Sequence, residues 1–401
     1  MFSSLKHMPS SIYIVLFGSL ATRTIYFMLW PFMAIIFYQK FDLSIIMTGT
    51  ILGIATLLSI TFSVYSGNLS DKIGRRPILI TGLLIVFFSF IPLIFLQSFP
   101  FYLVLSVGVS IGKGLIETVF KAIISDGIQD AEIKKQAFYW QYFCINIGGA
   151  VGPLLGVSFT LYFPRITFTV LAIIYLIYLV ICFRAFNQER KKLSGDHYSL
   201  IRSLSIIKKD SSFMLLIIAY IIIILVFGQL DSTLAQYFSR ENIPALVNLF
   251  SYLIAINCTV VVLFQFPFLK FVSKFSDNVQ VYLGIILLAI AQIIFSLTPT
   301  LFYLGWIAGI IVLSFGEIIL FSVVNVQIDK LAPDNLKGAY FGASSMYMLG
   351  LVLAPYIGGV LLQLSGRTML YSVMTLMCFV IFVAYKWAMT HHDRHLRAPS
   401  T

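Results

Sequence analysis

Long hydrophobic runs, separated by short polar stretches, follow one another along almost the whole chain. Most runs hold about 20 residues or more, the length that an α-helix needs to cross the hydrocarbon core of a bilayer. The pattern therefore predicts a membrane-spanning helix for each run. The twelve expected spans lie near residues 12–38, 45–66, 78–97, 101–125, 137–161, 166–186, 213–238, 245–269, 280–298, 301–325, 339–363 and 368–389. The expected fold class is an all-α polytopic membrane protein.

One connection between these spans is longer and more polar than the others. Residues 187–212 are rich in Lys and Arg, and they leave six predicted spans on either side. We therefore expect an N-terminal six-helix half at 1–186, a linker loop at 187–212, and a C-terminal six-helix half with a short tail at 213–401.

A pattern of small residues around a proline occurs twice, at an offset of 202 residues. The copies are Gly148-x-x-x-Gly152-Pro153-x-x-Gly156 in the fifth span and Gly350-x-x-x-Ala354-Pro355-x-x-Gly358 in the eleventh. An Asp–Asp–Lys pattern precedes each copy at nearly the same offset. Two parallel repeats of six spans are typical of duplicated transporters, so we expect two pseudo-symmetric halves.

Composition excludes the soluble classes of protein. Only 11% of the residues are charged and 59% are hydrophobic, whereas soluble domains carry about 25% charged residues. A water-soluble fold of this size could not cover its surface with so few charges.

The Lys and Arg residues predict the orientation in the membrane. With the N-terminus in the cytoplasm, 20 of the 27 lie in cytoplasmic connections or span ends, and three lie inside spans. Only Lys40, Arg165, Arg240 and Arg367 then face the outside. By the positive-inside rule, both termini are expected in the cytoplasm of a bacterium, with the chain in its inner (plasma) membrane. Anionic lipid headgroups account for the net charge of +11, so we expect no nucleic-acid partner.

Residues that would support catalysis or metal binding do not cluster in the sequence. The four cysteines lie singly in apolar runs without a Cys-x-x-Cys pair, and the five histidines lie outside the spans. We therefore expect no enzyme activity, no metal site and no cofactor.

The connection after the second span carries a dense pattern of small and charged residues. It reads Gly67-Asn-Leu-Ser-Asp71-Lys-Ile-Gly74-Arg75-Arg76-Pro. Gly67 permits close approach of a facing helix, and Gly74 suits a tight turn. Asp71 can oppose the N-terminus of a helix, while Arg75 and Arg76 can bind carboxylates or lipid phosphates.

This pattern resembles the cytoplasmic loop motif of the major facilitator superfamily at every defining position. The resemblance implies a twelve-helix, two-half fold and transport by alternating access. It also implies that Gly67, Asp71, Gly74, Arg75 and Arg76 form a cytoplasmic gate that breaks during transport.

The pattern Gly148, Gly152, Pro153 and Gly156 is similar to the fifth-span motif of the drug/proton antiporters of that superfamily. The resemblance implies a monomeric exporter of multidrug or peptide type, which exchanges small amphiphilic solutes for protons and draws energy from the proton gradient. Val157 departs from the family pattern, and so does Lys113, the nearest cation to the span-4 position where such exporters often carry arginine. A proton symporter that imports sugars, peptides or organic acids is the alternative, and a membrane-embedded sensor or enzyme is a remote one.

Ionisable residues within spans are costly and are therefore functional candidates. Glu317, in the middle of the tenth span, is the first candidate for proton coupling, and a structural carboxyl paired to another span is the alternative. Asp231, Glu117 and Asp126 are further candidates. Each has an alternative that the sequence leaves open. Asp231 could be solvated at the membrane boundary, Glu117 could be neutralised by its charged neighbours on span 4, and Asp126 could face a loop.

Cations and aromatic residues in the spans are candidates for the substrate cavity. Arg23 and Lys113 are the cations, and the partner of Arg23 is left open between Glu117 and Glu317. The aromatic candidates, which could stack on a bulky substrate, are Tyr26, Trp30, Trp140, Tyr142 and Tyr347.

Overall fold

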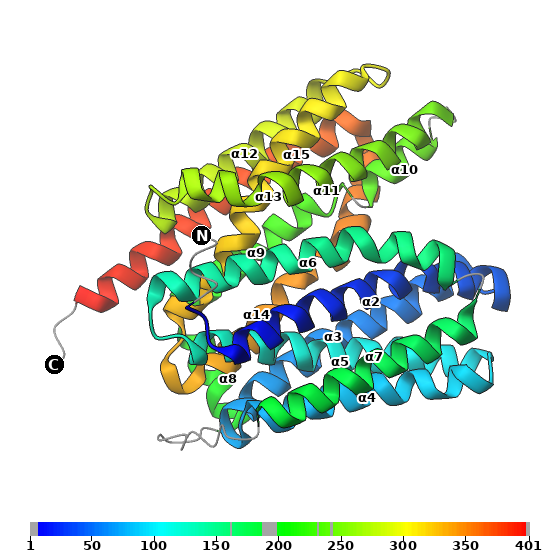
Figure 1. The fold of residues 1–401 in the computed structure, drawn as a ribbon. Helices are drawn as coiled ribbons and strands as arrows, with labels where there is room; N and C mark the ends of the chain where they lie inside the picture. The colour runs from blue at the N-terminus through cyan, green and yellow to red at the C-terminus, as the bar shows by residue number, and fades with distance from the viewer. Residues whose placement is uncertain (1–6, 161–162, 187–198, 231, 241–243, 398–401) are drawn as a thin grey trace. The chain divides into compact units, whose positions relative to one another are not determined.

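The structure is a computed structural model that describes residues 7–160, 163–186, 199–230, 232–240 and 244–397. All regular secondary structure in these residues is helical (Figure 1). In this part of the chain, nine helices are individually long and apolar enough to cross a bilayer, and α8 (Leu200–Lys209) with α9 (Ser211–Phe227) makes a tenth if that bent pair is one span. The prediction of an all-α polytopic membrane protein is confirmed.

The chain divides into two compact units, Met1–Ser205 with Ile328–Ser345, and Ile206–Gln327 with Met346–Thr401. The first unit contains α2 (Ser10–Phe41), α3 (Ile45–Ile73), α4 (Arg75–Phe95), α5 (Phe99–Gly127), α6 (Ala131–Phe159), α7 (Pro164–Ala185), the start of α8, η1 (Asp334–Leu336) and α14 (Lys337–Ser344). The second unit contains α9, α10 (Thr233–Arg240), α11 (Pro244–Val272), α12 (Asp277–Leu297), most of α13 (Tyr303–Leu331), η2 (Ser345–Met348) from its second residue, and α15 (Leu349–Arg397).

These units differ from the expected halves in two places. The first unit ends at Ser205, within the expected linker 187–212, and part of that linker forms α8. The first unit also includes 328–345, which the sequence assigns to the C-terminal half. The second difference arises because α14 packs against α3 of the first unit.

Local signals explain where several helices begin. Ser44, Asp130 and Asp210 are N-caps whose side chains accept a backbone N–H from the first turn of α3, α6 and α9. Pro164 occupies the first turn of α7, where its missing N–H costs nothing. These caps set the boundaries between consecutive hydrophobic runs.

The expected seventh span, 213–238, is interrupted. α9 ends at Phe227 and α10 begins at Thr233. At the break the backbone bonds shift to the i−3 pattern, from Gln229 N to Val226 O and from Leu230 N to Phe227 O. A continuous span is therefore wrong, because the 3₁₀-type bonds at this point end the α-helix.

The expected eleventh span, 339–363, is also interrupted. α14 ends at Ser344, the 3₁₀ turn η2 follows, and α15 begins at Leu349. The Ser344 hydroxyl donates to the Phe341 carbonyl at 2.7 Å. Such a bond from a side chain to the backbone competes with the regular i−4 hydrogen bonds of the helix. The turn expected between spans 11 and 12 is present within α15, where Gly366 has φ 72°.

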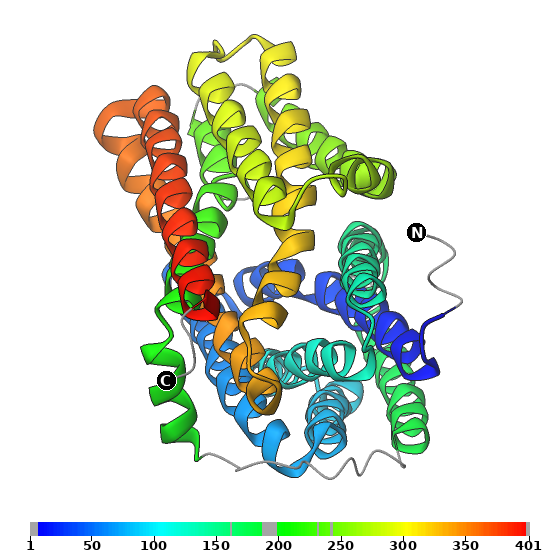
Figure 2. The ribbon, with the colours of Figure 1, turned by 90° about the vertical axis from the view of Figure 1, so that its left-hand side faces the viewer.

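Small residues bring one helix pair close together in each unit. In the first unit α6 runs along α2, as both views show (Figure 1, Figure 2). In the second unit α15 packs on α9, and a Cβ at Gly350 would lie 2.8 Å from the Leu225 amide nitrogen. The repeated Gly-Pro pattern thus marks the same helix pairing, span 5 on span 1 and span 11 on span 7, within each unit.

Candidate functional site

The Gly67–Arg76 motif is mostly helical. Gly67 to Ile73 form the last two turns of α3, and only Gly74, at φ 96°, separates them from α4. The tight turn at Gly74 is confirmed, because this φ is one that glycine adopts without strain. The expected loop before Gly74 is wrong, since the helical hydrogen bonds continue to Gly74 N, which donates to Ser70 O at 3.1 Å.

Gly67 lies where α3 and α14 approach each other closely. A Cβ at Gly67 would overlap the carbonyl oxygen of Gly338 and lie 3.0 Å from the Cα of Gly342. The expected role of Gly67 in the approach of a facing helix is confirmed.

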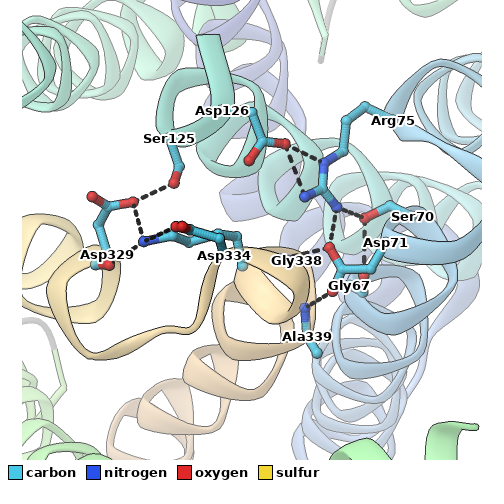
Figure 3. Close-up of polar contacts among 11 residues, drawn as sticks. Gly67, Ser70, Asp71, Arg75, Ser125, Asp126, Asp329, Asp334, Gly338 and Ala339 are labelled. Atoms are coloured by element: carbon cyan, nitrogen blue, oxygen red, sulfur yellow. Dashed lines mark hydrogen bonds and ion pairs between the residues drawn. The ribbon is translucent and has the colours of Figure 1, made fainter. Parts of the chain in front are cut away.

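Asp71 binds the N-terminus of α14. Its Oδ1 accepts the N–H of Gly338 at 2.9 Å and its Oδ2 accepts the N–H of Ala339 at 2.7 Å (Figure 3). Asp71 is buried, at 6% exposed. The interpretation that Asp71 opposes a helix N-terminus is therefore confirmed, since free N–H groups and the helix dipole favour an anion there.

Arg75 joins two carboxylates (Figure 3). Its Nη1 lies 2.5 Å from Asp71 Oδ1, and its Nη2 lies 2.9 Å from Asp126 Oδ2. We call Asp71, Arg75, Asp126, Gly338 and Ala339 the Asp71 cluster. Asp126 therefore forms an ion pair with Arg75, in contrast to the alternative in which its side chain only faces a loop.

Arg76 contacts the C-terminal end of α7. Its Nη2 donates to the carbonyl of Phe183 at 3.0 Å, and its guanidinium lies 4.3 Å from the centroid of the Phe183 ring. This carbonyl lies in the last turn of α7, where such groups lack a helical partner. No carboxylate pairs with Arg76 among the residues that the structure describes.

A second polar cluster, which the sequence did not single out as a site, surrounds Asp329 (Figure 3). Ser125 donates to Asp329 Oδ1, and Lys134 and Lys337 lie 3.4 and 3.3 Å from its carboxylate oxygens. The repeated Asp–Asp–Lys pattern was the available signal. It could not reveal that both lysines of the repeat converge on one aspartate.

A small cavity in the first unit brings together several residues that the sequence predicts for substrate binding. It is lined by Thr22, Tyr26, Val109, Lys113, Ile116, Glu117 and Tyr175, from α2, α5 and α7. We call this cavity, with Arg23 beside it, the Arg23 cavity.

Arg23 pairs with Glu117. The distance from Arg23 Nη1 to Glu117 Oε1 is 3.4 Å, and the two side chains are 19% and 30% exposed. The guanidinium also lies 4.9 Å from the centroid of the Phe27 ring. Glu117 is one of the two partners that the sequence left open, and it lies in the same unit as Arg23.

Lys113 lies on an aromatic ring. Its Nζ is 3.9 Å from the centroid of Tyr26, and Tyr26 stacks on Trp30 with centroids 5.2 Å apart and planes at 18°. Within the described residues, Glu117 forms its ion pair with Arg23 rather than with Lys113. The structure therefore gathers four of the predicted cavity residues, Arg23, Tyr26, Trp30 and Lys113.

The other predicted aromatic residues lie elsewhere. Trp140 and Tyr142 are buried on α6, where Trp140 contacts Phe143 edge to face at 5.6 Å. Tyr347 belongs to the second unit, where the centroid of its ring lies 6.3 Å from the centroid of the Tyr220 ring.

The glycines of the fifth-span motif face α2 at three successive turns. A Cβ at Gly148 would lie 3.0 Å from the Cβ of Arg23, and one at Gly152 would lie 2.6 Å from the Thr24 carbonyl oxygen. A Cβ at Gly156 would likewise lie 2.5 Å from the Met28 carbonyl oxygen. Pro153 lies inside α6. We call this contact the α2–α6 seam, and it holds the turn of α2 that carries Arg23.

Glu317 is buried in the second unit, at 7% exposed. Its Oε2 accepts a hydrogen bond from Asn257 Nδ2 at 2.8 Å, and the same nitrogen lies 3.0 Å from Ser314 Oγ. Asp231 lies outside the described residues.

Comparison with protein families identifies the chain. The family model described as Major Facilitator Superfamily matches residues 15–348. The chain belongs to the major facilitator superfamily. It is therefore a multi-pass membrane transporter of small molecules and not an enzyme.

Several known transporters are similar to most of this chain. YqjV, an uncharacterized MFS-type transporter of Bacillus subtilis, is 28% identical over 360 residues, which cover 88% of this chain and 85% of the relative. A Na⁺, Li⁺, K⁺/H⁺ antiporter of Planococcus maritimus is 26% identical over 386 residues, which cover 88% and 89%. The solved fucose:proton symporter FucP of E. coli has a TM-score of 0.76 at 14% identity, with 94% of this chain and 98% of that chain covered. At that identity the likeness shows the fold alone.

Proposed function

We propose that this transporter is a proton-coupled exporter, which exchanges small amphiphilic solutes for protons by alternating access in the plasma membrane. The observation that carries the proposal is the α2–α6 seam. Three glycines of the antiporter-like motif, Gly148, Gly152 and Gly156, contact the backbone or side chains of α2 directly. Such glycine contacts allow two helices to approach closely, here at the turn that carries Arg23.

A relative supports exchange rather than co-transport. The Planococcus maritimus protein is described as an antiporter and is similar along 88% of this chain. The likeness to the fucose symporter concerns the fold and does not favour either direction.

The proton site that we propose first is Glu317. Its carboxylate is buried and accepts a hydrogen bond from the neutral amide of Asn257, a donor that can serve either protonation state. Glu117 and Asp126 are less favoured, because each is already held in an ion pair with an arginine, Arg23 or Arg75. The proton gradient is the energy source in this proposal, without a cofactor, and the working unit is a monomer.

In the same proposal, the Asp71 cluster is the cytoplasmic gate. Its buried, charge-assisted hydrogen bonds stabilise one arrangement of α3 and α14, and they would have to break for α14 to leave α3.

The test uses purified protein in liposomes that contain the pH-sensitive dye pyranine. Ethidium, Na⁺, fucose and 2-naphthalenesulfonate are added outside, one at a time. An antiporter moves protons out as solute enters, so we expect the interior to become alkaline with at least one solute. Protein-free liposomes provide the control. Acidification of the interior on solute addition would show a symporter and overturn the proposal.

A further inference from the structure

α8 differs from the predicted spans in length, composition and direction. It holds ten residues, which extend over about 15 Å and cannot cross the hydrocarbon core of a bilayer. A single residue, Asp210, separates it from α9, a helix of 17 mostly apolar residues. The angle between α8 and α9 is 83°. With α9 crossing the membrane, α8 therefore runs nearly parallel to the membrane plane, at the end of a span.

One face of α8 is held by the protein itself. Ser203 and Ile207, which lie one helical turn apart, are 1% and 5% exposed. The Ser203 hydroxyl oxygen accepts a hydrogen bond from the side-chain amide of Asn68 at 2.5 Å. Asn68 is also buried, and it belongs to the Gly67–Arg76 motif at the end of α3. This bond, within the first unit, fixes which face of α8 turns toward the protein.

The opposite face of α8 is exposed and combines apolar with basic side chains. Ile201 is 81% exposed and Leu204 is 39% exposed. Arg202, Lys208 and Lys209 are exposed as well. Ile201, Leu204 and Lys208 follow the i, i+3, i+7 spacing that places residues on one side of a helix. The long basic side chains can reach phosphate groups while the aliphatic ones beside them enter the boundary between headgroups and acyl chains.

The charge of α8 selects the kind of surface that it fits. Its ten residues carry a formal charge of +3, from one arginine and two lysines, and none of them is acidic. The positive-inside rule places this connection in the cytoplasm, and the anionic lipids of the cytoplasmic leaflet attract basic segments. A second copy of the chain would bring the same three cations to the contact, and the two copies would repel each other.

We propose that α8 is a lipid-binding helix, whose exposed face binds anionic phospholipids of the cytoplasmic leaflet. Ile201 and Leu204 enter the boundary between headgroups and acyl chains, and Arg202, Lys208 and Lys209 bind lipid phosphates. The headgroup region is within reach, because α8 ends one residue before the apolar helix α9 begins. The inference goes beyond the proposed function, and it holds whichever solute the protein carries and in whichever direction.

The test places a fluorescent reporter on the exposed face. Ile201→Cys, in the full chain with the four native cysteines replaced, is labelled with the environment-sensitive dye NBD. The protein is reconstituted in vesicles of phosphatidylcholine, or of phosphatidylcholine and phosphatidylglycerol in equal parts. Doxyl-labelled lipids quench a dye that lies among lipids, and the neutral quencher acrylamide quenches a dye in water.

With phosphatidylglycerol we expect stronger quenching by doxyl lipid and weaker quenching by acrylamide. Added salt should reduce this difference, because it screens charges at the membrane surface. Glu132→Cys provides the control for the label, since Glu132 is exposed in the first turn of α6, close to the N-cap Asp130. Acrylamide should quench the dye at this position equally in both kinds of vesicle.

Variants assign the effect to α8. Replacement of both Lys208 and Lys209 by Gln should lower the ratio of lipid-inserted to water-exposed reporter about tenfold or more in the mixed vesicles. Replacement of both by Arg keeps the charge and should keep the ratio. The matched control replaces Lys270 and Lys274 by Gln, which removes two exposed lysines near the end of α11, and should leave the ratio unchanged.

Four results would overturn the inference. A reporter in water in both kinds of vesicle would show that α8 stays off the membrane. Equal doxyl quenching in both kinds would show that headgroup charge plays no part. Equal losses in the two Gln pairs would assign the effect to the total charge of the protein. Protection from both quenchers would place another protein surface over α8. The comparison of vesicles needs neither Gln pair, so it decides even if one of them does not fold.

Discussion

At the residue scale, the carboxylate of Asp71 holds three donors at once, two backbone N–H groups of α14 and the guanidinium of Arg75. Asp71→Asn keeps the size of the side chain but replaces one acceptor oxygen with an NH₂ group, which faces a donor. A hydrogen bond to a charged group contributes about 1.5–3 kcal/mol. We therefore expect the state held by this cluster to lose population and transport to slow about tenfold or more.

The measurement is the initial transport rate of Asp71→Asn in proteoliposomes, with folding checked by gel filtration. Asp130→Asn is the matched control, because Asp130 is an exposed N-cap and Asn caps a helix equally well. A wild-type rate in Asp71→Asn would mean that the motif only sets topology.

Glu317 is the residue on which the coupling proposal depends. Glu317→Gln keeps the hydrogen-bond acceptor for Asn257 but cannot carry a proton. We expect uphill transport driven by a pH gradient to be lost, while counterflow exchange between two substrate pools survives, since exchange moves no net proton.

Both activities are measured in proteoliposomes with the solute that gives the largest proton flux in the wild type. A structural role for Glu317 predicts another outcome, in which exchange, uphill transport and thermal stability all fall together. Full pH-driven accumulation by Glu317→Gln would transfer the proposal to Glu117, Asp231 or Asp126.

At the scale of elements, the contact of α14 with α3 depends on the absence of a side chain at Gly67. Gly67→Ala would place a Cβ on the Gly338 carbonyl oxygen. Overpacking of this kind costs about 1–3 kcal/mol, and we expect thermal unfolding in detergent to show a loss of that size. Gly53→Ala, on the same helix with nothing within 4 Å, should be neutral or stabilising by up to about 1 kcal/mol. Equal stability of both variants would argue against a tight contact.

The α2–α6 seam gives a second matched pair of variants. A Cβ at Gly152 would lie 2.6 Å from the Thr24 carbonyl oxygen, whereas one at Gly149 would lie 3.6 Å from Phe27, an ordinary contact. Gly152→Ala should push α2 away, disturb the Arg23–Glu117 pair and reduce transport at least several-fold, whereas Gly149→Ala should transport normally. The initial transport rates of the two variants decide, and equal rates would contradict a functional role for the seam.

The size of Gly67 and the charge of Asp71 are local properties, so their contacts with a facing helix could be predicted without knowing which helix that was. The break between the end of α9 at Phe227 and the start of α10 at Thr233 could not, and neither could the break between Ser344 and Leu349, because hydrophobic periodicity does not distinguish i−3 from i−4 bonding. The pairing of Arg23 with Glu117 joins residues 94 positions apart, and spacing along one chain cannot choose between partners on different helices.

At the scale of the whole molecule, the number of membrane crossings between two connections decides whether they lie on the same side of the membrane or on opposite sides. The exposed cations are distributed unevenly between alternate connections, and the positive-inside rule turns that bias into an orientation. Lys40 and Arg165 belong to the sparsely charged set, whereas Arg202 and Lys208 belong to the densely charged one. All four side chains are exposed, so each can report its side of the membrane.

We expect opposite labelling of these two sets by a membrane-impermeant maleimide, tested as single cysteines after replacement of the four native ones. Lys40→Cys and Arg165→Cys should react in intact cells, because the connections that hold them are expected outside. Arg202→Cys and Lys208→Cys should react only after permeabilisation, because the connection between spans 6 and 7 is expected in the cytoplasm. Each set controls for the other, since a reagent that leaks into cells would label both. Reaction of Arg202→Cys in intact cells would reverse the orientation if Lys40→Cys were then protected, and would show an even number of crossings between them, in place of the expected five, if Lys40→Cys also reacted.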